Sequence, residues 1–229
     1  MQKKLNYFTR GEWALWIGST LLILISFLLF DRSSYLTLIA SLIGAASLIF
    51  GAKGHPVGQL LMVVFSLLYG VISWSFSYYG EMITYLGMTA PMALFAFLSW
   101  LKNPFQGNKS EVAVNRLQLG EIGFMLLLTT AVTWLFYYIL RYFDTANLGL
   151  SALSVTTSFV AVYLTFRRSP FYALAYAAND VILIFLWLLA AKDDPSYFSV
   201  VICFAMFLVN DLYGFANWLR MQKRQEALI

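Results

Sequence analysis

Long apolar runs separated by short polar segments fill most of the chain. Each run is long enough to cross a hydrocarbon core of about 30 Å as an α-helix. Eight such helices are predicted, at residues 12–30, 35–52, 57–79, 82–101, 119–142, 148–166, 171–191 and 196–219. The first run is longer than the apolar part of a signal peptide and has no small-residue cleavage site after it, so we expect a retained helix. The pattern predicts an all-α polytopic membrane protein with eight transmembrane helices.

The composition agrees with this class. Hydrophobic residues make up 61% of the chain and charged residues only 11%, whereas a soluble domain has about 25% charged residues. The net charge of +4 lies in loops and tails and does not indicate nucleic acid as a partner. Cys203 and His55 are the single cysteine and histidine, so we expect no disulfide framework, no metal site and no cofactor.

The basic residues predict the orientation in the membrane. With a cytoplasmic N-terminus, only Arg32, Arg141 and Lys192 lie outside. The remaining basic residues then lie inside: Lys3, Lys4, Arg10, Lys53, Lys102, Lys109, Arg116, Arg167, Arg168, Arg220, Lys223 and Arg224. Such an excess of Lys and Arg is typical of cytoplasmic loops. We therefore expect both termini, and the long linker LKNPFQGNKSEVAVNRLQ, on the cytoplasmic side.

Two three-helix segments resemble each other. Lys53 and Arg167 each lie three positions before a proline, Pro56 or Pro170, that begins a helix, where the missing N–H is tolerated. The segments end in similar tetrapeptides, Ser99-Trp100-Leu101-Lys102 and Asn217-Trp218-Leu219-Arg220. A single helix at 119–142 separates them, so both segments have the same orientation. Parallel repeats of this kind are a transporter architecture with the substrate site near the midplane.

This reading divides the chain into five parts. They are a cytoplasmic N-terminus with an extra transmembrane helix (1–34), a first three-helix unit (35–102), a linker with a connecting helix (103–147), a second three-helix unit (148–221) and a cytoplasmic tail (222–229). The expected core is therefore 3+1+3 helices.

The same Asn-Asp dipeptide interrupts two of the apolar runs, as Asn179-Asp180 and Asn210-Asp211. Both aspartates lie about 14 Å from the expected cytoplasmic helix ends, which is close to the bilayer centre. An ionisable residue at this depth costs at least about 2.5 kcal/mol. We expect both carboxyl groups to face a polar cavity or a partner.

Three helix faces supply the remaining candidate residues for substrate binding. With the two Asn-Asp pairs, the candidates are Tyr176 and Trp187 on one helix, Tyr213 and Asn217 on the last helix, and Ser66, Tyr69, Ser73 and Trp74 on the third. Gln59, Gly70 and Ser77 extend the stripe on the third helix, and Pro91 interrupts the fourth. The alternative is purely structural, since Asn and Asp can join helices by hydrogen bonds and aromatic residues can pack or form an interfacial belt.

The two units differ at these positions, which favours a site for an asymmetric ligand. Phe65-Ser66 and Met92-Ala93 occupy the places of the two Asn-Asp pairs in the first unit. Carboxylates beside aromatic faces suit a flat, positively charged ring, and Asn and Asp also suit the diol of a ribose. No Gly-rich phosphate loop and no Lys or Arg is expected at this depth, so a phosphorylated ligand is disfavoured.

Three stretches resemble the PnuC-type bacterial vitamin transporters, over about residues 35–221: YGVISWSFSYYGEMITYLGMTAPMALFAFLSWLKNP, NDVILIFLWLLA and NDLYGFANWLR. The resemblance implies a SWEET-like fold, a homotrimer in the inner membrane, and uptake of nicotinamide riboside by facilitated diffusion. It also implies a cytoplasmic kinase that traps the substrate by phosphorylation.

Other functions remain open from the sequence. Relatives in this family carry thiamine, riboflavin or deoxynucleosides. An intramembrane aspartyl enzyme would use two aspartates, but the GxGD pattern of such proteases is absent. A receptor or scaffold without transport is the third class.

Overall fold

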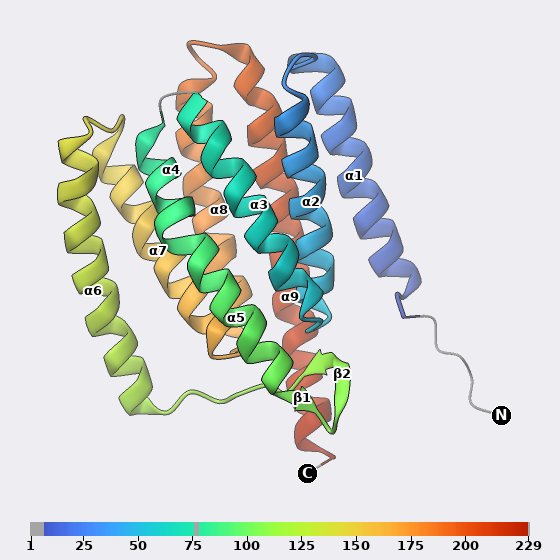
Figure 1. The fold of residues 1–229 in the computed structure, drawn as a ribbon. Coiled ribbons are helices and arrows are strands. Elements are labelled where there is room, and N and C mark those ends of the chain that lie inside the picture. Colours follow the sequence, from blue (N-terminus) through green and yellow to red (C-terminus); the bar gives the residue numbers. More distant parts are fainter. Residues whose placement is uncertain (1–6, 76–77, 229) are drawn as a thin grey trace.

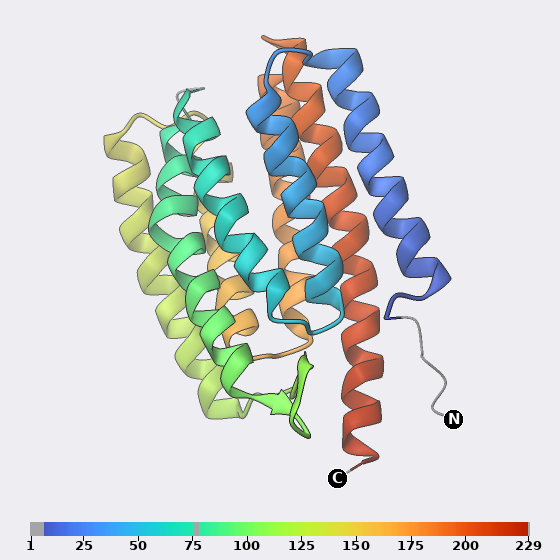
Figure 2. The same ribbon diagram turned by 45° about the vertical axis from the view of Figure 1, so that its right-hand side comes forward.

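The computed structural model describes residues 7–75 and 78–228, which form an up-and-down bundle of helices (Figures 1 and 2). Eight helical spans in these residues are long and apolar enough to cross a membrane. They are α1 (Arg10–Phe30), α2 (Tyr35–Ala52), α3 (Val57–Ser75), a fourth span (Tyr79–Lys102), α6 (Leu119–Tyr142), α7 (Leu148–Phe166), α8 (Phe171–Ala190) and a last span (Pro195–Glu226) that contains α9 (Phe198–Glu226). The predicted number of spans is confirmed.

Two predicted helix ends were wrong. Helix α3 ends at Ser75 rather than 79, because Tyr79 already begins the next helix, α4 (Tyr79–Thr84). Helix α9 continues to Glu226 rather than ending at 219. Its last turns are held by the linker, since the Gln225 side chain accepts a hydrogen bond from the backbone N–H of Val114 at 2.8 Å. Three residues of the sequence argument, Lys3, Lys4 and Ser77, lie outside the described residues.

The fourth span is a broken helix. Helix α4 passes into a π-helical segment, Tyr85–Thr89, and then into α5 (Ala90–Lys102). Pro91 stands in the first turn of α5, and its missing N–H and its ring prevent a regular α-helix from running through this point. π-Helical segments inside helices occur frequently at functional sites. The break lies halfway along the bundle, beside the cavity described below.

The linker after α5 contains a small β-hairpin that the all-α prediction missed. Strands β1 (Pro104–Phe105) and β2 (Asn108–Val112) pair in antiparallel fashion. Gln106 and Gly107 form the turn, both with positive φ angles. The strands are too short and too polar to give an alternating sequence pattern. The hairpin covers the same end of the bundle as the end of α9 (Figure 1).

The two three-helix segments pack across each other through matching helices. Helix α2 lies against α9, and α7 lies against α5. The indole Nε1–H of Trp218 donates to the carbonyl oxygen of Gly51 at 2.9 Å. Trp100 makes the corresponding bond to the carbonyl of Thr165, also at 2.9 Å. The two segments thus make corresponding contacts, while their relation as two parallel repeats stays a prediction.

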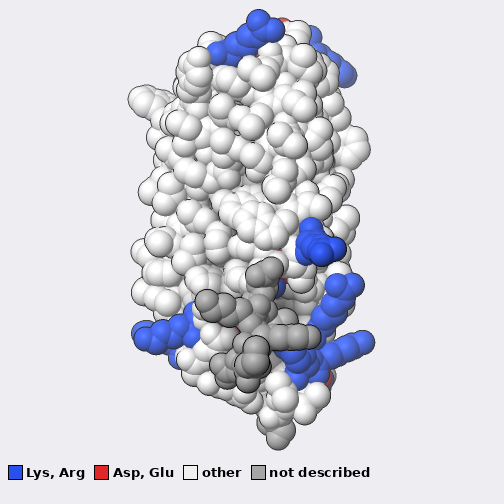
Figure 3. Space-filling view, turned by 90° about the vertical axis from the view of Figure 1, so that its right-hand side faces the viewer, with Lys and Arg blue, Asp and Glu red and all other residues white. Residues whose placement is uncertain are grey.

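The outer surface is that of a membrane protein. Figure 3 shows one face of the molecule, which is mostly white, with Lys and Arg at its top and mainly in its lower half. Helices α1 and α6 lie at opposite edges of the bundle in both ribbon views, and α6 has few buried residues. We call the end that carries the hairpin and the C-terminus the lower end, and the end that carries residues 31–34 and 143–147 the upper end, as in Figure 1. The protein is an integral membrane protein.

Candidate functional site

A small cavity lies at the centre of the bundle, where α3, α8, α9 and the broken fourth span meet. Its free volume is about 20 Å³, which is room for about one water molecule. The lining residues are Leu48, Met62, Phe65, Tyr85, Thr89, Ser158, Tyr176, Asn179, Asp180, Phe204, Phe207 and Asp211. A nucleoside-sized ligand does not fit in this conformation, so the helices must separate before one can bind.

Asp180 and Asp211 meet in this cavity. Each side chain is about 4% exposed, and the two carboxyl groups are direct electrostatic neighbours. Among the described residues, Oδ2 of Asp180 has no hydrogen-bond partner, and no Lys or Arg lines the cavity. Two buried carboxyl groups without a cation repel each other unless a proton or a positive ligand lies between them. The arrangement can therefore recognise a cation or hydroxyl groups.

Asn179 lies beside them with its acceptor atom already used. Its Oδ1 accepts hydrogen bonds from the hydroxyl groups of Ser154 at 3.2 Å and Thr157 at 2.9 Å. Both hydroxyls come from α7, so the amide is held between two helices. Tyr176, one turn earlier on α8, also lines the cavity and lies within electrostatic range of both aspartates. Four residues of the predicted site therefore lie together at the cavity: Tyr176, Asn179, Asp180 and Asp211.

The stripe on α3 lies next to this group, towards the upper end. The indole N–H of Trp187 donates to the hydroxyl of Tyr69 at 2.8 Å. Ser66 and Ser73 are fully buried, and their hydroxyl groups have no partner within residues 7–75 and 78–228. Buried hydroxyl groups without partners are uncommon. Ser66 and Ser73 therefore belong to a row of polar side chains on α3 that leads away from the cavity.

Three of the predicted residues on α9 do not face the cavity. The Asn210 amide donates to Ser19 in α1 at 2.9 Å. The Tyr213 hydroxyl donates to Glu12 in α1, and the Asn217 amide donates to a backbone carbonyl of α2. Neighbouring residues on a helix point about 100° apart, so only one member of the Asn210-Asp211 pair can reach the cavity. Asn210, Tyr213 and Asn217 therefore lie on other faces of α9 than Asp211, and their role in binding stays a prediction.

Trp74, another predicted site residue, does not line the cavity. Its side chain is 62% exposed and lies on the outer surface of the bundle, while Ser73 beside it is buried. Neighbouring residues on a helix point about 100° apart, so Trp74 and Ser73 lie on different faces of α3. The position of Trp74 suits a lipid-facing residue.

Glu12 is a buried acidic residue that the sequence argument missed. It is 1% exposed and accepts hydrogen bonds from Tyr213 at 2.9 Å and from Lys53 at 3.2 Å. It also completes a capping box with Thr9 at the start of α1. Tyr7 packs beside this group, and its burial, followed by the Glu12 charge, raises the pKa of the Tyr7 hydroxyl to about 12. These contacts fasten α1 to α2 and α9.

Glu81 is the second acidic residue that was missed. It is 5% exposed, and its Oε2 has no hydrogen-bond partner in the part of the chain that the structure describes. It precedes Tyr85 and Thr89, which line the cavity, at four-residue intervals along the broken span. The prediction began this helix at residue 82, so Glu81 counted as a loop residue. Ending the preceding helix earlier and starting this one at Tyr79 would have placed Glu81 inside a span.

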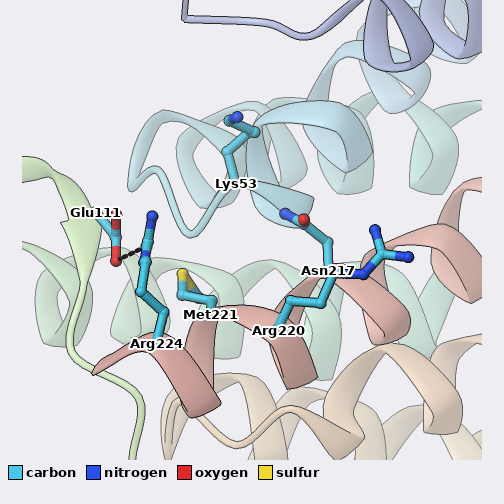
Figure 4. A pocket seen from close by; sticks show the side chains of 6 residues that line it. All are labelled: Lys53, Glu111, Asn217, Arg220, Met221 and Arg224. Atoms are coloured by element: carbon cyan, nitrogen blue, oxygen red, sulfur yellow. Dashed lines mark hydrogen bonds and ion pairs between the residues drawn. The ribbon is translucent and has the colours of Figure 1, made fainter. Parts of the chain in front are cut away.

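A second hollow, of about 160 Å³, lies at the lower end (Figure 4). It is lined by Lys53, Glu111, Asn217, Arg220, Met221 and Arg224. Arg224 pairs with Glu111, as the dashed line in Figure 4 shows, and Lys53 pairs with Glu12 at 3.1 Å. Two of the three basic side chains that line the hollow are thus paired with carboxylates within the protein.

His55 has a local structural contact. Its Nδ1 accepts a hydrogen bond from the backbone N–H of Val57 at 3.1 Å, which caps the start of α3. Burial lowers the pKa of the imidazole, which favours the neutral form that can accept a hydrogen bond through Nδ1. No group of three or more His, Cys, Asp or Glu in the described residues could hold a metal ion.

Comparisons with known proteins now give this geometry a family. The model of the family described as "Nicotinamide mononucleotide transporter" matches residues 34–220. A nicotinamide riboside transporter PnuC from Neisseria mucosa is 28% identical over 95% of this chain and 86% of its own length. Its counterpart from Haemophilus influenzae is 25% identical over 83% of this chain and 82% of its own length.

A solved structure has the same fold. It is described as "Crystal structure of the Vitamin B3 transporter PnuC", and its TM-score is 0.83 at 22% identity, over 95% of this chain and 94% of that chain. The likeness covers all of the bundle. Because the family model also spans most of the chain, the protein belongs to the PnuC family and is a membrane transporter rather than an enzyme.

Proposed function

We propose that the protein carries nicotinamide riboside across the bacterial inner membrane by facilitated diffusion. The observation that supports this most strongly is the buried pair Asp180 and Asp211, which meet in a central cavity lined by aromatic residues and by no described cation. The curated relatives from two bacteria are named as nicotinamide riboside transporters. The substrate is a pyridinium ring on a ribose, so it combines the two chemical features that such a cavity can bind.

The binding residues in this proposal are those that the structure brings together. Asp180 and Asp211 face the positive ring or the ribose hydroxyls, and Asn179 turns its amide NH₂ towards an acceptor of the substrate because Oδ1 is already bonded. Tyr176 contributes an aromatic face. Ser66, Tyr69, Ser73 and Trp187 lie along the approach. The proposal does not include Asn210, Tyr213, Asn217 and Trp74, because none of these residues lines the cavity.

The cavity chemistry favours the riboside over the mononucleotide, although the family description names the mononucleotide. A phosphate would have to lose its water beside two carboxyl groups, and like charges at short range in a low-dielectric site are strongly unfavourable. Substrate that is phosphorylated by a cytoplasmic kinase would then be unable to leave. This trapping drives uptake in one direction without a pump.

The setting of the transporter forms part of the same proposal. Both termini lie in the cytoplasm, as the distribution of Lys and Arg indicates. Three copies assemble into a homotrimer, as the family resemblance implies. The sequence has no Gly-rich phosphate loop and places no Lys or Arg at the depth of Asp180 and Asp211, which supports a uniporter.

Uptake into liposomes tests the proposal. Vesicles that contain the purified protein, without ATP or an ion gradient, should take up radiolabelled nicotinamide riboside until the inside and outside concentrations are equal. An excess of unlabelled riboside should block the signal, and nicotinamide mononucleotide should not. Accumulation above the outside concentration under a sodium or proton gradient contradicts uniport, and equal competition by the mononucleotide contradicts the site.

Competition with related compounds decides among the remaining substrates. Thiamine, riboflavin and deoxynucleosides should compete at least tenfold more weakly than nicotinamide riboside. A receptor or scaffold would bind one of these compounds without moving it, so binding without uptake contradicts transport.

A further inference from the structure

Glu81 is a buried carboxyl group that the binding site described above does not use. It lies in α4, one helical turn before Tyr85, on the side of the cavity that faces the upper end. Four residues along a helix correspond to a rise of about 6 Å. Glu81 therefore lies next to the central cavity but apart from Asp180 and Asp211.

The surroundings of Glu81 leave its charge without a partner. No Lys or Arg forms an ion pair with it in the described residues, and its Oε2 is buried without a hydrogen bond. Ser154, which also bonds Asn179, lies beside its carboxyl group. A buried carboxyl group is unfavourable unless it is paired or fully hydrogen-bonded. Within the described residues, the Oε2 atom of Glu81 therefore lacks a hydrogen-bond partner.

Tyrosine rings connect this carboxyl group to the cavity. The hydroxyl of Tyr85 lies within electrostatic range of both Glu81 and Asp180. The hydroxyl of Tyr69 also lies within range of Glu81, and the Tyr69 and Tyr85 rings are 4.4 Å apart between centroids. A carboxylate with aromatic faces nearby is the combination that attracts an organic cation. The rings form a continuous path between the two acidic positions.

We propose that Glu81 is a specificity-determining residue, whose carboxylate recognises the positive charge of the substrate ring on the upper side of the central cavity. This inference rests on the proposed function, because it takes a cationic nucleoside as the substrate. A cationic ring beside Glu81 supplies the partner that Oε2 lacks in the protein. A neutral ring of the same shape gains nothing from the carboxylate.

The test compares two ligands of nearly equal shape in one variant. Nicotinamide riboside carries a positive ring, and its reduced dihydro form carries a neutral one. Glu81→Gln keeps the size of the side chain and removes its charge. We expect calorimetry on the full-length protein to show about a tenfold loss of affinity for the cationic form. The affinity for the reduced form should change by less than about twofold.

Other variants separate this role from a structural one. Glu81→Asp keeps the charge and should keep the preference for the cationic form. Glu12→Gln removes a different buried carboxylate, far from the cavity at the lower end, and should leave the ratio of the two affinities unchanged. Glu81→Met is a second neutral variant with the same expected ratio, so the test does not depend on the folding of one protein.

The outcomes are distinct. A wild-type protein that neither binds nor transports nicotinamide riboside overturns the proposed function. A wild-type protein that transports it, with an unchanged affinity ratio in Glu81→Gln and Glu81→Met, overturns only the role of Glu81. Equal weakening of both ligands shows a structural role and also overturns the inference.

Discussion

The two three-helix segments share their framework contacts. In the first segment the Ser99 hydroxyl donates to the carbonyl of Phe166 at 3.1 Å, and in the second the Asn217 amide donates to the carbonyl of Ala52 at 2.8 Å. The tryptophan that follows each of these residues makes the next bond to the same partner helix. Each segment therefore fastens its last helix to the first helix of the other segment.

The segments differ where the cavity lies. Asp180 and Asp211 in the second segment take the places of Ser66 and Ala93 in the first. The side chain of Ser66 is buried near the cavity, but it carries no charge. The matched residues join the helices of the two segments, whereas the unmatched aspartates line the central cavity. A substrate with two chemically different ends needs a site to which the two segments contribute different side chains.

The largest effect should come from the unmatched aspartate. Asp180→Asn removes a charge from the cavity and should weaken the binding of nicotinamide riboside by about 10- to 100-fold, because hydrogen bonds to charged groups are the strongest ones. The matched control is Ser66→Ala in the first segment, which should change the affinity by less than about threefold. Calorimetry in detergent measures both variants.

Size-exclusion chromatography must show that both variants are monodisperse. Unchanged affinity in Asp180→Asn would make this residue a link between helices and not a binding group. An equally large loss in Ser66→Ala would mean that the site draws on both segments alike.

Much of the framework was predictable from the sequence because its signals are local. Apolar runs set the eight spans to within a few residues, except for the end of α9 at Glu226. Pro56 and Pro170 mark helix starts because their missing N–H is tolerated there. The Asn179-Asp180 pair stands out because charges are rare in such runs. The central placement of Asp180 and Asp211 follows from residue counts along two antiparallel helices.

The remaining features of the site depend on how each helix is rotated about its axis and on hydrogen-bond partners that lie far away in the sequence. In the sequence, Asn210 and Asp211 form one candidate pair. In the structure, α1 packs against the face of α9 that carries Asn210, and only Asp211 lines the cavity. Glu12 is satisfied by Lys53, which lies 41 positions away, and no local pattern indicates that pairing. Glu81 was missed because the predicted helix began at residue 82, whereas α4 begins at Tyr79.

A smaller effect, on stability, should be equal in the two segments. Trp100→Phe and Trp218→Phe each remove an indole N–H that is bonded to a helix-end carbonyl at 2.9 Å. Both tryptophans are almost fully buried. Each variant should lose about 1–3 kcal/mol of unfolding free energy, as is typical when a buried polar group loses its partner. Thermal unfolding in detergent measures the loss, and a large effect in one variant alone would contradict the matched framework.

The smallest effect should come from the pair Ser99 and Asn217. Ser99→Ala and Asn217→Ala each remove one half-buried hydrogen bond to a helix end, so each should reduce the unfolding free energy by about 1 kcal/mol. Neither side chain lines the cavity, so the affinity for nicotinamide riboside should remain within about twofold of the wild-type value. Calorimetry and thermal unfolding on the same preparations separate the two properties. A marked loss of affinity in Asn217→Ala, without one in Ser99→Ala, would return Asn217 to the binding site and show that the second segment contributes more than its cavity-facing residues.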